Sequence, residues 1–153
     1  MARLLPFEYH DVGKQSLPND SMKAAYQFWC DAKGNDDIPR QDNIDLERAP
    51  QDLRDGFSIV VVENLSYRLR FTTTGDRAKQ AFGRDIRQIS FDDFPNGKAV
   101  TARMNICVRS RRPYYSQGPM NRGTSFLDFM ALVMPLANPK NEVSQLLVYA
   151  EYL

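Results

Sequence analysis

The side chains best suited to catalysis or metal binding are few in this chain and lie far apart. The one histidine, His10, falls in an aperiodic N-terminal stretch, so a Ser-His or Cys-His nucleophile system would need that stretch to fold into a site. Cys30 and Cys107 are too distant in sequence to indicate a disulfide framework or a zinc site. Asp92 and Asp93 are typical of a solvated helix cap, and no glycine-rich phosphate loop occurs. We therefore predict no catalytic residue, no bound metal and no enzymatic activity.

Ligand binding is a second kind of chemistry, and one arginine is placed for it. Apolar side chains recur at helical spacing between Lys98 and Arg112, and Arg103 lies three residues after Val100 and four before Cys107. From this border of the apolar stripe it could reach a pocket between the helix and a sheet and pair with an anion. The candidate pocket residues are Tyr67, Phe71, Arg103, Met104 and Tyr115. The alternative is that these side chains fill an ordinary core and that Arg103 lies over its edge.

Strands predicted on both sides of that helix would form the opposite wall of such a pocket. Phe57–Glu63 is continuous and β-branched, which favours a strand covered on both faces, while Ser66–Thr74 alternates and predicts its hairpin partner. The turn between them falls at Asn64 and Leu65. Three further strands are predicted after the helix, at Tyr114–Met120, Ser125–Leu136 and Val143–Leu153, with the last two joined by a turn at residues 138–141.

Two more helices are predicted from periodicity and caps. Residues 21–33 carry an amphipathic stripe that begins after Asp20 or Ser21 and ends at Gly34, and a short helix runs from Asp76 through Phe82. A turn of helix is expected near residue 45. Residues 1–20 show no period and are predicted to form an N-terminal arm that could be flexible, ahead of a single domain at residues 21–153.

The long strand at residues 125–136 has apolar side chains on both of its faces. Since an antiparallel sheet usually leaves one face to water, something must cover the second face. The helix at residues 21–33, with Trp29, can do so within the chain, and a second copy of the protein is the other possibility. The residues predicted for such an interface are Tyr26, Phe28 and Trp29.

Composition narrows the class of protein and its partners. The chain has 153 residues, 42% of them hydrophobic, with a net charge of +1 and no apolar run of membrane-spanning length or secretory signal, so we expect a cytoplasmic protein without a membrane partner. Residues 98–122 are basic and residues 31–55 are acidic. The near-neutral total charge and the absence of a binding motif argue against nucleic acid, and favour an acidic protein partner or a homodimer for the basic stretch.

A series of short motifs in a shared order resembles the small stand-alone bacterial PAS-like proteins. The match spans residues 22–153 and consists of Phe28-Trp29, the segment Ile38–Asp45, Tyr67-Arg68-Leu69-Arg70, Gly75, Phe82-Gly83-Arg84-Asp85, Arg112-Pro113-Tyr114-Tyr115 and Met134-Pro135-Leu136. One departure is a second glycine of the family, expected a few residues after Asp85, where this chain has Gln88 or a neighbour.

This resemblance implies an α+β fold with a five-stranded antiparallel sheet, helices on one face and an N-terminal amphipathic helix. It implies a role in signal transduction as a sensor or docking unit, without catalysis. Haem sites in similar proteins use a histidine on the long helix, which here has none, and residues 105–109 hold the letters of a flavin motif at the wrong spacing. We therefore predict no cofactor.

Three functions remain open at this point. The leading hypothesis is a non-catalytic signalling module that acts by docking to a protein partner or to itself. The alternative is a receptor for an anionic or aromatic small molecule, which a void of at least ~300 Å³ between the long helix and the sheet would favour. An enzyme with a similar helix-and-sheet shape would need an acid-base residue in the pocket, and Asp128 is the candidate.

Overall fold

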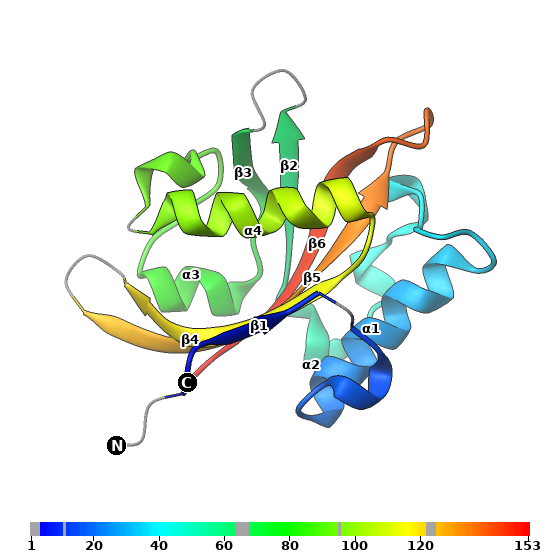
Figure 1. Cartoon of the computed structure of the whole chain (residues 1–153). Coiled ribbons are helices and arrows are strands. Elements are labelled where there is room, and N and C mark those ends of the chain that lie inside the picture. The colour runs from blue at the N-terminus through cyan, green and yellow to red at the C-terminus, as the bar shows by residue number, and fades with distance from the viewer. Residues whose placement is uncertain (1–3, 11, 64–67, 95, 122–124) are drawn as a thin grey trace.

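An antiparallel sheet of six strands forms the centre of the fold, in the order β1-β4-β5-β6-β2-β3 (Figure 1). The computed structural model describes residues 4–10, 12–63, 68–94, 96–121 and 125–153. The strands are β1 (Phe7–Tyr9), β2 (Phe57–Glu63), β3 (Arg68–Thr73), β4 (Tyr114–Asn121), β5 (Phe126–Ala137) and β6 (Val143–Tyr152). The α-helices are α1 (Asp20–Lys33), α2 (Gln51–Arg54), α3 (Asp76–Phe82) and α4 (Gly97–Ser110). Among the described residues, no helix is both long and apolar enough to cross a membrane.

The α+β fold predicted from the sequence is confirmed, with one strand more than expected. All five predicted strands are present, and β2 has the predicted bounds. The sixth is β1, which pairs antiparallel with the outer edge of β4 through Phe7 and Gln117, although the segment was expected to be an arm without regular structure. The predicted turn at Asn64 and Leu65 lies outside the described residues.

Helices cover both faces of the sheet. Successive residues of a strand point to opposite faces, so Tyr149 faces away from its neighbours Val148 and Ala150. The rings of Tyr149 and Phe57 lie 5.1 Å apart, and Phe28 of α1 lies 5.4 Å from Phe57, which places α1 on that face. The helices α3 and α4 lie across the other face (Figure 1). The second apolar face of β5 is therefore covered within the chain.

Trp29 anchors α1 to β5. The amphipathic stripe of the helix buries Met22, Ala25 and Trp29, and the indole Nε1 donates a hydrogen bond to the carbonyl oxygen of Pro135 at 2.9 Å. Asn19, one residue before the predicted cap, accepts a hydrogen bond from the backbone N–H of Met22 and begins the helix. The helix thus begins one residue earlier than predicted and ends at the predicted Gly34.

This contact also explains how a proline fits into a long strand. Proline has no N–H to give to a neighbouring strand, so it is tolerated only where that side of the strand is unpaired. The pairing of β4 with β5 stops at Val133, before Pro135. Beyond that point the indole N–H of Trp29 donates to the carbonyl oxygen of Pro135, and the backbone N–H of Ala137 donates to the carbonyl oxygen of Pro39 at 2.9 Å.

The connections after β5 and after α3 each depend on a few local residues. In the β5–β6 turn, Asn138 Oδ1 accepts hydrogen bonds from the backbone N–H groups of Lys140 and Glu142, at 2.9 and 3.0 Å. After α3, Gly83 ends the helix with φ +69°, and Gln88 has φ +67°. Gln88 therefore holds a left-handed conformation that favours glycine, at the place where the resemblance leads one to expect a glycine.

Candidate functional site

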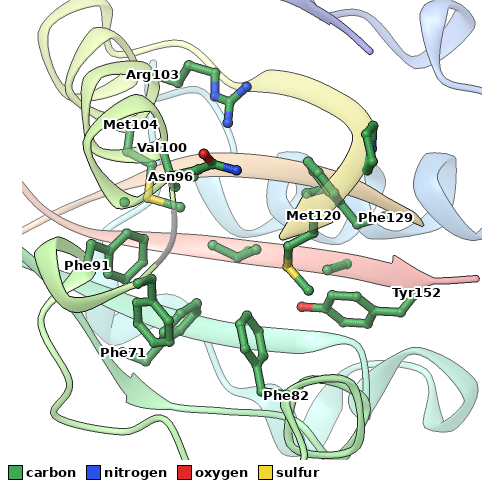
Figure 2. Close-up of a pocket in the computed structure, with 16 residues that line it drawn as sticks. Phe71, Phe82, Phe91, Asn96, Val100, Arg103, Met104, Met120, Phe129 and Tyr152 are labelled. Carbon is green, nitrogen blue, oxygen red and sulfur yellow. The ribbon is translucent and has the colours of Figure 1, made fainter. Parts of the chain in front are cut away.

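A cavity of about 140 Å³ lies between the N-terminal half of α4, helix α3 and the sheet (Figure 2). Its lining is mostly apolar and consists of Phe71, Phe82, Phe91, Phe94, Asn96, Gly97, Val100, Arg103, Met104, Pro119, Met120, Phe129, Ala131, Val148, Ala150 and Tyr152. A space of this size in a protein interior would ordinarily be filled by side chains, since protein interiors contain few voids larger than a water molecule. The void therefore needs a structural cause.

Small side chains on the two central strands provide that cause. Ala131 of β5 and Ala150 of β6 are directly paired, and both point to the face that carries α4. Side chains at paired positions lie only about 4.5–5.5 Å apart at their Cβ atoms, so two alanines side by side leave a shallow floor. Val148, the next residue of β6 on this face, extends that floor.

Aromatic rings form one side of the cavity. The ring centres are 5.0 Å apart for Phe71 and Phe91, 6.0 Å for Phe91 and Phe94, and 5.5 Å for Phe94 and Phe82. The series ends at Tyr152, 6.5 Å from Phe82. These tilted and edge-on contacts are the favourable geometries for aromatic pairs, so the wall is both apolar and stiff.

Two of the polar side chains of the cavity, Arg103 and Asn96, lie apart from this wall, and the third belongs to Tyr152 at its end. In Figure 2 the guanidinium of Arg103 and the side-chain amide of Asn96 lie on the same side, above the sheet, and the hydroxyl of Tyr152 points inward. Burial raises the pKa of Tyr152 to about 12, so this hydroxyl is neutral at pH 7 and can donate a hydrogen bond. The side chain of Asn96 makes no capping hydrogen bond to α4, which leaves its amide available.

Arg103 has no acidic partner in the part of the chain that the structure describes. The ion pairs found there join other residues, and none of the described lining residues is acidic. Arg103 is half-buried, and an arginine side chain stays charged at any ordinary pH. The cavity thus has one fixed positive charge at its edge, and no carboxylate of its described lining neutralises that charge.

Three of the five predicted pocket residues lie together at this cavity. Phe71, Arg103 and Met104 line it, whereas Tyr67 lies outside the described residues. The placement of Tyr115 in the pocket is wrong. Tyr115 lies on the opposite face of the sheet, where its ring is 5.4 Å from Tyr9 and its hydroxyl donates to Gln117 Oε1. Its neighbour Tyr114 is the one that points toward α4, because adjacent residues of a strand alternate and Tyr114 pairs with Val133.

The residues predicted for a docking interface are packed within the chain. Only 3% of Trp29 is exposed, and its ring lies 6.0 Å from that of Tyr26. Tyr26 and Phe28 are half-buried and pack against the core. These three side chains therefore do not form an exposed aromatic patch.

The remaining candidates for chemistry lie away from the cavity or in the core. Asp128 does not line the cavity, and its carboxylate accepts the backbone N–H of Leu4 at 3.2 Å. His10 Nε2 lies 3.2 Å from Glu8 Oε2. Cys107 is fully buried, and burial raises the pKa of its thiol far above the ordinary range. Within the described ranges, no group of three or more metal-binding side chains is gathered in one place.

Sequence reasoning missed most of the cavity lining. The missed residues with the largest or most polar side chains are Phe82, Phe91, Phe94, Asn96, Met120, Phe129 and Tyr152. One signal was available, since three phenylalanines fall within residues 82–94 in a segment otherwise rich in polar residues. Aromatic residues that recur in a polar connection are candidates for a wall that packs back onto the sheet.

Comparison with known proteins identifies a family for this chain and a solved structure with a similar fold. The family model described as PAS domain matches residues 17–149. Among solved structures, an RNA-binding Light-Oxygen-Voltage receptor superposes with a TM-score of 0.53 at 7% sequence identity, over 96% of this chain and 38% of that receptor. The chain thus spans well under half of that protein, and at this identity the likeness shows the fold alone. A search of curated proteins finds no match.

Proposed function

The chain belongs to the PAS domain family, and on that premise we propose that its sensory role depends on a small molecule held in the cavity between α4 and the sheet. The observation that carries this proposal is the cavity itself, an apolar space with two polar side chains, Arg103 and Asn96, on one side. Concave, mostly apolar sites with a few convergent polar groups are the usual form of small-molecule sites. The ligand would be the signal, or would report it.

The volume limits what the cavity can hold. At about 140 Å³ it does not reach the ~300 Å³ named above as favouring a receptor, which is the size at which sites for drug-sized molecules begin. An apolar cavity of ~150 Å³ nevertheless binds benzene when engineered into a protein core. The buried part of the ligand is therefore about the size of one aromatic ring or a short branched chain.

Docking through α1 has less support than ligand binding. The side chains proposed for that interface are buried or half-buried in this structure, with the indole of Trp29 hydrogen-bonded to β5. A partner would have to displace contacts that already stabilise the fold. We also propose that the module is non-catalytic. The support for this is that Asp128, the acid-base candidate, does not line the cavity.

Native mass spectrometry can test the proposal. The protein would be incubated with a whole-cell small-molecule extract, freed of unbound material by gel filtration and weighed under non-denaturing conditions. Ala150→Leu fills the cavity floor, and Ala102→Leu makes the same change on the exposed side of α4 as a matched control. We expect a stoichiometric adduct on the wild type and on Ala102→Leu, and none on Ala150→Leu. A wild type without an adduct, or an adduct that survives Ala150→Leu, contradicts the proposal.

A further inference from the structure

We infer that the cavity takes a small monocarboxylic acid with an apolar body, and that Arg103 binds its carboxylate. This inference rests on the proposed function and adds the chemical class of the ligand. Its grounds are the charge at the edge of the cavity, the composition of the walls and the volume between them.

The charge argument begins with an arginine that is half-buried without a carboxylate partner. Transfer of a charged group out of water is costly unless a group of opposite charge pairs with it. Arg103 lines the cavity, and no ion pair of Arg103 occurs among the described residues. An anion at the edge of the cavity would supply the missing partner, and the planar guanidinium can donate two parallel hydrogen bonds to a carboxylate.

A second group on the same side of the cavity suits the carboxylate head. The amide of Asn96 lies on the same side of the cavity as the guanidinium (Figure 2) and can donate to a carboxylate oxygen. Arg103 is the one cationic residue of the described lining, which suits a singly charged anion better than a phosphate dianion or a dicarboxylate.

The walls specify the rest of the molecule. Phe71, Phe82, Phe91 and Phe94 present ring faces and edges without a hydrogen-bonding group, and the floor is made of alanine and valine. A polar body placed there would lose its hydrogen bonds to water without replacement. At about 140 Å³, the space accepts a body near the size of benzene, with the carboxylate outside it at Arg103. Aromatic and short branched-chain acids have this shape.

Calorimetric titration with two matched probes tests the inference. Benzoate carries the ring and the carboxylate, whereas benzyl alcohol has a ring of the same size without the charge. The variants are Arg103→Gln, which removes the charge at the cavity, and Arg109→Gln, which removes an exposed charge from the same helix outside the lining. Thermal unfolding of each variant shows that it is folded before titration.

The expected result is that benzoate binds the wild type and Arg109→Gln equally, and binds Arg103→Gln about tenfold or more weakly. Benzyl alcohol should bind all three proteins with the same affinity. If benzyl alcohol binds and Arg103→Gln leaves the affinity for benzoate unchanged, the inference of an acid is overturned, while the cavity remains a ligand site. If neither probe binds the wild type, the inference fails, and the extract experiment then decides whether the proposed function fails with it.

Discussion

The substitution Trp29→Phe tests whether the aromatic side of α1 belongs to the core or to an interface. Phenylalanine keeps an aromatic ring but has no N–H, so the buried carbonyl of Pro135, now bonded at 2.9 Å, loses its donor. An unsatisfied buried acceptor costs about 1–3 kcal/mol. The smaller ring also leaves a void at a site that is 3% exposed, which costs about 1 kcal/mol more. The expected loss of unfolding free energy is therefore about 2–4 kcal/mol, or a fall in Tm of about 4–16 °C.

Chemical denaturation followed by far-UV circular dichroism measures this loss. Tryptophan fluorescence is unsuitable because Trp29 is the only tryptophan of the chain. Tyr26→Phe, half-buried on the same helix, is the control, and it should lose less than about 1 kcal/mol because it removes a single hydroxyl. Light scattering on the same samples measures association. A loss below about 1 kcal/mol for Trp29→Phe, or a change in association without a loss of stability, would refute the reasoning and favour the hypothesis that Trp29 belongs to an interface.

Two further predictions concern the connection after α3. Because φ is +67° at Gln88, Gln88→Gly should raise the unfolding free energy measured by denaturation by about 1 kcal/mol. The same change at Gln80, inside α3, should lower it by a similar amount. Equal effects of the two changes would contradict the argument from backbone strain. Hydrogen bonds from Arg87 to the Asp85 carboxylate lower its pKa to about 2, so this group stabilises the fold above about pH 4 and the contribution is lost as pH falls toward 2. Asp85→Asn should therefore show a smaller fall in Tm than the wild type between pH 4 and pH 2, and parallel curves would argue against the interaction.

Local rules were sufficient to predict most of the elements. Phe57–Glu63 was predicted with both ends correct, because a continuous β-branched run has few alternatives to a buried strand. The helix Asp76–Phe82 was bounded by Gly83, whose φ of +69° is a conformation that glycine adopts without strain. The turn after β5 depends on Asn138, whose side chain bonds to the backbone within four residues. In each case the signal and its structural effect are close together in the chain.

The features that the sequence did not predict depend on contacts between distant segments. The strand β1 has three residues and forms because the edge of β4 is available to it, more than a hundred residues away in sequence. The face of Tyr115 is decided by its pairing with Leu132, while Tyr114 pairs with Val133. Two adjacent tyrosines at the start of a strand give no local sign of which one points toward α4. The register of the strand pairing decides the face, and residue propensities do not predict register.

The apolar stripe of α4 performs two tasks that its periodicity does not distinguish. At the C-terminal half Cys107 is fully buried, with its sulfur 4.0 Å from the carbonyl oxygen of Val133, so the helix is in close contact with β5 there. At the N-terminal half Val100 and Met104 face the paired alanines of the sheet floor, and the contact opens into the cavity. The difference arises from the strands, because Val133 fills its position whereas Ala131 does not. An arginine at the border of the stripe therefore reaches a cavity only in the N-terminal half, which is where Arg103 lies.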